Sequence, residues 1–123
     1  MLYRMRIYQA VPENLPLFHE FFRRWLLPIQ QRHGARLIGR WETDDGRVVA
    51  VWEYDDRAAY QRIESAVRQD PDLILAQQHR ALLPPIITSR EEVFMSSTLP
   101  PGAAAPVPSG GATIPRGNDG IRR

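Results

Sequence analysis

The chain has 123 residues, of which 43% are hydrophobic and 24% charged, which fits one globular domain and excludes a disordered protein. It contains no cysteine, so disulfides, iron–sulfur clusters and cysteine nucleophiles are excluded. Residues 1–99 hold 13 arginines and 13 acidic residues, so the net charge of +2 belongs to residues 100–123. Because a nucleic-acid-binding domain concentrates positive charge on its folded part, we expect no nucleic-acid partner. We also expect no membrane span and no secretory signal, and therefore a cytoplasmic protein.

The first two predicted elements are a strand and a long helix. Residues 2–10 alternate aromatic or apolar with basic side chains, which is strand periodicity. Apolar residues then recur every three or four positions from Leu15 to Ile29, which predicts a helix over residues 14–33. Within it we expect Asn14 as a cap, a kink at Pro28 and a stop at Gly34.

A hairpin and a second helical region follow. Residues 36–43 and 47–54 are rich in β-branched and aromatic side chains and flank the turn sequence Asp-Asp-Gly. Asp55 or Asp56 can cap the next helix, and Asp70 followed by proline starts another short one. Residues 86–95 supply the last strand. The order β-α-β-β-α-(α)-β predicts an α+β, ferredoxin-like domain with a four-stranded antiparallel sheet.

Both faces of this predicted sheet carry apolar side chains, whereas the helices can cover only one. A second copy of the same sheet is the simplest cover for the other face, so we predict a homodimer. The folded domain ends at residue 99. Residues 100–123 hold 5 prolines, 5 glycines and 4 alanines, which predicts a disordered tail.

Five short motifs resemble those of one known family, in the same order. Residues 3–8 resemble the Y-x-L-R-x-Y opening of NIPSNAP domains, and residues 27–34 their "L-P-L…R-H-G" segment. Residues 37–43 resemble "L-V-G-x-W-E-T", residues 51–56 "Y-L-W-E-Y-D-D", and residues 70–72 the "D-P-E" turn. The resemblance implies a dimeric α/β barrel in which two ferredoxin-like sheets face each other. It implies no reaction, because single-domain members have no agreed chemistry.

The aromatic residues of the hairpin are candidates for ligand binding. A two-residue turn would pair Gly39 with Trp52 and place Trp41, Trp52 and Tyr54 on one face, beside the gap left by Gly39 and Ala50. The alternative is that these rings pack the core or the dimer interface. A three-residue turn would separate the two tryptophans and remove the slot.

The polar candidates are Arg6 and Tyr8 on the first strand, and two histidines. Arg6 has the planar donor fork that binds a carboxylate or phosphate, or it pairs with Glu42 or Glu53. His33 caps the end of the first helix or transfers a proton. His79 is a surface or core histidine. The resemblance also implies a haem ligand as an alternative, because relatives in the same superfamily degrade haem, but no local motif supports it.

No standard catalytic signature is present, and we expect no metal and no cofactor. Three functions stay open. The first is a homodimer that binds a small apolar or aromatic molecule. The second is a cofactor-independent oxygenase or isomerase that uses His33 or His79. The third is a non-catalytic interaction protein.

Overall fold

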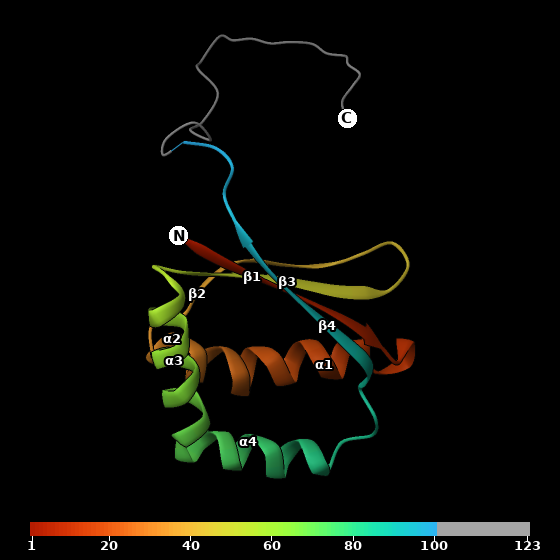
Figure 1. Ribbon diagram of the computed structural model, residues 1–123. Helices are drawn as coiled ribbons and strands as arrows, with labels where there is room; N and C mark the ends of the chain where they lie inside the picture. The colour runs from red at the N-terminus through yellow and green to blue at the C-terminus, as the bar shows by residue number, and fades with distance from the viewer. Residues whose placement is uncertain (101–123) are drawn as a thin grey trace, which may run out of the picture.

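The protein is an α+β domain whose helices all lie on one side of a four-stranded antiparallel sheet (Figure 1). The computed structural model describes residues 1–100, so the expected tail lies outside the described residues apart from Pro100. The strands lie in the order β2-β3-β1-β4, the ferredoxin-like arrangement that the sequence predicts. The elements are β1 (Leu2–Ala10), η1 (Pro12–Asn14), α1 (Leu15–Phe21), η2 (Phe22–Leu26), α2 (Leu27–Arg32), β2 (Arg36–Glu42), β3 (Arg47–Tyr54), α3 (Arg57–Gln69), α4 (Pro71–Ala81) and β4 (Ile87–Ser96).

The predicted first helix is present, but its hydrogen-bonding pattern changes from α to π and back to α along its length. A π-helical turn, η2, separates α1 from α2 and comes just before Pro28. Proline has no N–H and its ring collides with a carbonyl of the preceding turn in a regular α-helix, and a wider turn accommodates both. Asn14 makes no side-chain cap. It donates instead to the carbonyl of Pro85 at 2.7 Å, which fastens the start of α1 to the entry of β4. Gly34 has a φ of 102° and ends α2 as expected.

The next two helices begin at aspartates. Asp56 accepts a hydrogen bond from the N–H of Ala59 at 2.7 Å at the start of α3. Asp70 accepts from the N–H of Asp72 at 2.9 Å at the start of α4. These are the side-chain caps that the sequence predicts. Within the described residues, no helix combines the length and the apolar character needed to cross a bilayer.

The hairpin between β2 and β3 does not have the register expected for a two-residue turn, so Trp41 and Trp52 do not share a face. Thr43 and Arg47 close a three-residue turn, in which the N–H of Thr43 donates to the carbonyl of Arg47 at 2.8 Å. Trp41 therefore pairs with Val49, and a bulge at Ile38 restores the register so that Leu37 pairs with Trp52.

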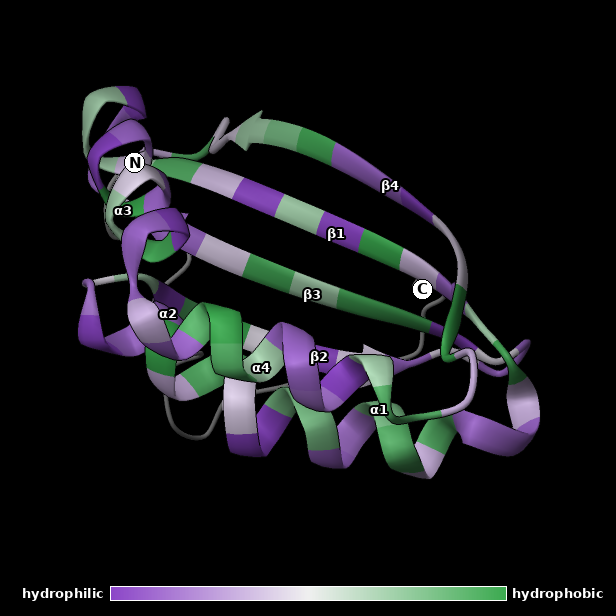
Figure 2. Ribbon diagram, turned by 90° about the horizontal axis from the view of Figure 1, so that it is seen from below, coloured by the Kyte–Doolittle hydropathy of each residue, from purple (hydrophilic) through white to green (hydrophobic). Residues whose placement is uncertain are grey.

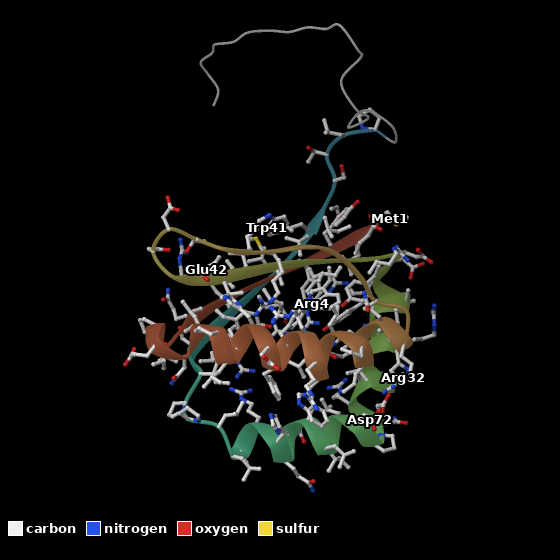
Figure 3. All side chains as sticks on the ribbon, turned by 180° about the vertical axis from the view of Figure 1, so that it is seen from behind. Met1, Arg4, Arg32, Trp41, Glu42 and Asp72 are labelled. Carbon is white, nitrogen blue, oxygen red and sulfur yellow. The ribbon has the colours of Figure 1, made fainter. Side chains whose placement is uncertain are left out.

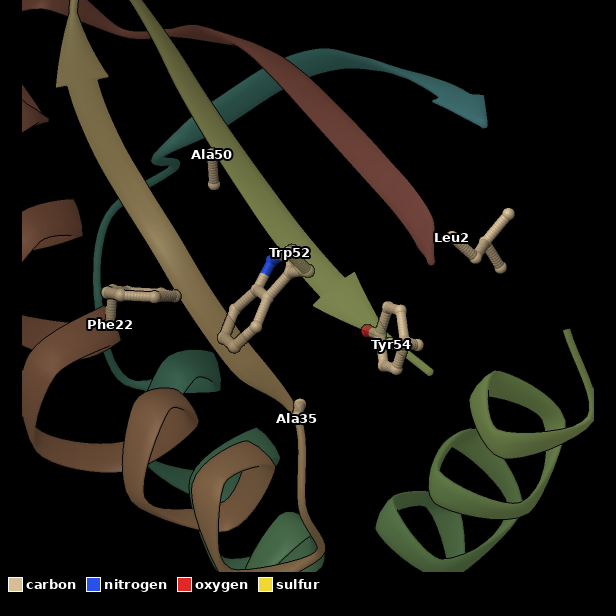
Figure 4. Packing of buried hydrophobic residues seen from close by; sticks show 6 residues of the cluster. All are labelled: Leu2, Phe22, Ala35, Ala50, Trp52 and Tyr54. Carbon is tan, nitrogen blue, oxygen red and sulfur yellow. The ribbon is translucent and has the colours of Figure 1, made fainter. Parts of the chain in front are cut away.

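Successive residues of β3 point to opposite faces. Val48, Ala50, Trp52 and Tyr54 are buried toward the helices, and their neighbours face away from them. Figure 4 shows Trp52 and Tyr54 packed in the central core cluster with Phe22. This helix-facing side of the sheet also carries Arg4 and Arg6 from β1, because Arg4 pairs with Trp52 and Arg6 with Ala50.

The opposite side of the sheet, which we call the open face, is covered by no helix (Figure 1). Most of the residues paired across it are apolar or aromatic, and these are Tyr3, Met5, Ile7, Trp41, Val49, Val51, Val93 and Met95. Arg36, Glu53 and Glu91 are charged residues of the same face. Trp41 is 52% exposed and Val93 38% exposed. An apolar sheet face of this kind is typical of an interaction surface.

Candidate functional site

A cavity of about 250 Å³ lies between the helix-facing side of the sheet and helices α1, α3 and α4. Seen from the helix side, α1, α2 and α4 lie toward β2 and β3, while β1 and β4 stand clear of them (Figure 2). Part of the wall is aromatic, with the rings of Tyr8, Phe18, Phe21, Phe22 and Trp52. Tyr8 and Phe18 meet edge to face, with ring centroids 5.3 Å apart.

The cavity wall also carries a concentration of positive charge. One carboxylate, that of Glu64, lines it together with five guanidinium groups, which belong to Arg4, Arg6, Arg68, Arg80 and Arg90. These arginines come from β1, α3, α4 and β4, so four separate elements bring their charge to one place. Among the described residues, no three carboxylate or histidine groups are arranged to hold a metal ion.

Among the arginines of this cluster that form ion pairs, Arg4 is the most buried. Its side chain is 7% exposed, its Nε donates to Oε1 of Glu92, and its Nη2 lies 3.6 Å from Oε2 of Glu64. The guanidinium also stacks over the ring of Tyr60 at 5.2 Å. Burial by itself lowers the pKa of Arg4, but the hydrogen bonds to Glu92 and Tyr54, together with the nearby Tyr60 and Glu64, outweigh it and raise that pKa. Arg4 is therefore charged and paired (Figure 3 shows it between sheet and helices).

The two polar candidates from β1, Arg6 and Tyr8, both line the cavity. The guanidinium of Arg6 lies over the Tyr8 ring, 5.3 Å from its centroid. The predicted pairing of Arg6 with Glu42 or Glu53 is wrong. Glu42 lies on the edge strand β2, and its Oε1 is 3.0 Å from Nε2 of His19. Glu53 lies on the open face and accepts hydrogen bonds from Tyr3 and Arg36.

The three aromatic candidates of the hairpin are not together. Trp52 lines the cavity and is 4% exposed, whereas Tyr54 is 1% exposed and packs against Tyr60 outside it. Burial raises the pKa of the Tyr54 hydroxyl. Trp41 lies on the open face, on the other side of the sheet from Arg4 (Figure 3). The slot expected between Trp41 and Trp52 is thus absent, because the turn has three residues.

His33 lies outside the cavity lining. It is the C-cap residue of α2, and its Nε2 is 2.6 Å from Oδ2 of Asp70. The Arg32 guanidinium donates to the same oxygen at 2.8 Å. This cluster fastens the end of α2 to the junction of α3 and α4.

His79 also lies outside the cavity, in a separate hollow of about 210 Å³ between α1, η2 and α4. Its ring stacks on Trp25 with centroids 5.1 Å apart and on Phe21 at 6.2 Å. A histidine held between two aromatic rings fits the expectation of a surface or core residue.

Two features of the site escaped sequence reasoning. Arg68, Arg80 and Arg90 are far apart in sequence and follow no motif, and only the fold brings them together. The second feature is Arg40, which stacks on Phe22 at 4.3 Å and on Phe18 at 4.8 Å, next to the cavity. Its Nη1 donates to Nδ1 of His19 at 2.9 Å, and burial lowers the pKa of Arg40 to about 10.

Comparison with known proteins agrees with the fold. The sequence profile of the NIPSNAP family matches residues 3–98. No curated protein matches the chain. An uncharacterized NIPSNAP domain protein from Burkholderia xenovorans has a similar structure, with a TM-score of 0.69 and 29% identity, covering 87% of this chain and 100% of that one.

More distant structures share the fold alone. A NIPSNAP family protein from Agrobacterium tumefaciens is 20% identical, with a TM-score of 0.69 and coverage of 79% of this chain and 92% of that one. A putative antibiotic biosynthesis monooxygenase from Nitrosomonas europaea is 14% identical, with a TM-score of 0.58 over 80% of this chain and 100% of that one.

Proposed function

The chain belongs to the NIPSNAP family, and from that premise we propose that it is a homodimer in which each protomer binds a small apolar or aromatic molecule. The bound molecule occupies the cavity between the sheet and the helices. The observation that carries this proposal is the cavity itself, a space of about 250 Å³ with aromatic rings on its wall. Concave sites with apolar walls and a few convergent polar groups are where proteins bind small molecules.

The size of the cavity limits the ligand. Sites for drug-sized compounds enclose about 300–1,000 Å³, and this one is somewhat smaller. A compound of one or two fused rings fits such a space. Flat rings would stack against Trp52 and Phe22, which meet at 60° with centroids 6.1 Å apart.

The dimer forms through the open face. Eight apolar or aromatic side chains from all four strands lie there without a covering layer in the protomer. A second copy supplies a matching surface by symmetry, and removal of this area from water drives association. The cavity lies on the other side of the sheet, so each protomer keeps its own site.

A catalytic role through His33 or His79 finds no support in their positions, because neither histidine lines the cavity. His33 is engaged by Asp70, and His79 stacks between two rings. Binding is therefore the function that the site supports best.

Native mass spectrometry on protein purified gently from its own host tests both parts of the proposal. We expect a dimer that carries an additional small mass on each protomer. Ala76 on α4 is a lining residue that also packs in the core with Phe21, Ile29 and Val67. Ala76→Leu, once thermal unfolding has shown that it folds, should therefore intrude on the space that the ligand needs and remove the additional mass. Ala81→Leu, the same change on the exposed end of α4, is the control and should keep it.

Two results would contradict the proposal. A protein that is monomeric in this measurement would contradict dimerisation through the open face. A dimer that carries no small mass, and that binds none of a set of one- and two-ring compounds, would favour a non-catalytic interaction protein instead.

A further inference from the structure

We propose that the molecule held in the cavity is an organic acid, an aromatic or apolar body with a carboxylate, and that Arg6 binds the carboxylate. This inference rests on the small-molecule function proposed above and names the ligand class. Its basis is a surplus of positive charge in the cavity that the protein does not itself neutralise.

The available carboxylates of the site are used by Arg4. Glu64 lies 3.6 Å from Arg4, and Glu92 accepts the hydrogen bond of the Arg4 Nε. The charge of Arg4 is thereby neutralised within the protein. Of the other four arginines of the wall, Arg6 makes only a long ion pair with Glu92, at 3.8 Å. Arg68, Arg80 and Arg90 form no ion pair with the residues that the structure describes.

Arg6 is the arginine placed to receive a ligand. Its side chain is 17% exposed, and its Nε is buried and makes no hydrogen bond within the described residues. The nearest carboxylate oxygen, Oε1 of Glu92, is 3.8 Å away and already accepts from Arg4. A buried donor without an acceptor is costly, and an acceptor supplied by a ligand removes that cost.

Arg68, Arg80 and Arg90 extend the positive potential along the same wall. Each comes from a different element, and no acidic group of the described residues lies within ion-pair distance of any of them. Basic groups that converge on a cavity with apolar walls focus their field and attract an anion. The guanidinium of Arg6 presents two parallel N–H groups, which match the two oxygens of a carboxylate.

The aromatic part of the wall argues for more than an inorganic anion. Tyr8 lies under the Arg6 guanidinium, and the rings of Phe18 and Trp52 also face the cavity. A phosphate ion would leave these rings uncovered, whereas an aromatic acid would contact both parts of the wall. The site therefore fits a carboxylate attached to a ring system.

A matched pair of probes tests the ligand class by isothermal titration calorimetry on the full chain. The probes are 2-naphthoate and 2-naphthamide, which have the same ring system and nearly the same shape but differ in charge. We expect naphthoate to bind at least tenfold more tightly than naphthamide. In Arg6→Gln this preference should fall to threefold or less. Arg62→Gln, an exposed arginine on α3 outside the cavity, is the control and should keep the full preference.

Each other result overturns the inference in a recognisable way. Equal affinity for the two probes leaves small-molecule binding intact but excludes the acid. Failure of both probes to bind the folded wild-type protein contradicts the binding function as well. Displacement of naphthoate by an equal concentration of inorganic phosphate shows that the rings are not recognised. If thermal unfolding shows Arg6→Gln to be misfolded, Arg6→Met, which keeps most of the length of the side chain without its charge, replaces it, and an unchanged naphthoate preference there overturns the inference.

Discussion

The indole ring of Trp41 lies over Gly39 on the open face, so that a Cβ at position 39 would overlap the ring. The gap that the sequence places beside the tryptophans is therefore filled by Trp41 itself. The ring sits on the surface that we assign to the dimer, and the three-residue turn sets its direction.

We expect Gly39→Ala to weaken the dimer, because the added methyl group forces Trp41 away from its position. The ring is 52% exposed and can move, so the stability of the protomer should change little. A displaced rotamer costs about 0.5–1.5 kcal/mol in each protomer. The cost per dimer is therefore about 1–3 kcal/mol, which corresponds to a roughly fivefold to hundredfold weaker dimer. Analytical ultracentrifugation measures the dissociation constant. Leu82→Ala, at an exposed position after α4, is the control and should leave it unchanged.

A stronger test of the open face is a charge at its centre. Val51 pairs with Met5 on β1 and with Gly39 on β2, and it points away from the helices. Val51→Lys would leave an unpaired charge between the two sheets, which costs about 3 kcal/mol or more, so the dimer should weaken by roughly a hundredfold or more. Val51→Thr has nearly the same shape and should retain the dimer under the same conditions. A Val51→Lys protein that stays dimeric in sedimentation would place the interface elsewhere.

Most of the fold follows from local patterns in the sequence. The caps Asp56 and Asp70, the stop at Gly34 and the alternation of β1 each depend on residues close together in the chain, and each is confirmed. The hairpin register is wrong by one residue because Asp-Asp-Gly fits both a two-residue and a three-residue turn. The shift by one residue reverses the direction of the side chains of residues 39–42, and the bulge at Ile38 returns Arg36 and Leu37 to their expected faces.

The site is predicted less completely than the fold. Arg6, Tyr8 and Trp52 are identified and line the cavity, but the charge surplus is not, because residues 1–99 are neutral in total. A chain whose total charge is zero can still hold an excess of arginine at one site, because its acidic residues lie at other places in the fold. Asp70, for example, pairs with Arg32 outside the cavity. The side of β1 that carries Arg4 and Arg6 also faces the helices. The alternation of side chains shows that β1 has two different faces, but not which of them the helices cover.

Acid stability should depend on Asp70. The N–H of Asp72, the ring of His33 and the guanidinium of Arg32 lower the pKa of Asp70 to about 2, from an ordinary value of about 3.9. Because the folded-state value is the lower one, the stabilisation is present above pH of about 4 and is lost as the pH falls toward about 2. Asp70→Asn should lower Tm at neutral pH and flatten the decrease of Tm between pH 4 and pH 2. Asp44→Asn removes the same charge from the exposed turn, and a Tm profile like that of wild type is expected for it.

Ligand binding should be visible in the fluorescence of one tryptophan. Of the three tryptophans, Trp52 lines the cavity, whereas Trp41 lies on the open face and Trp25 beside His79. An aromatic acid in the cavity would contact the Trp52 indole and change its emission, with little effect on the other two. The double variant Trp25→Phe and Trp41→Phe should therefore keep most of the emission change seen on titration with 2-naphthoate, while Trp52→Phe should lose most of it. A change that follows Trp41 instead would place the ligand on the open face, between the two sheets, and would leave the arginines of the helix side without a role in binding it.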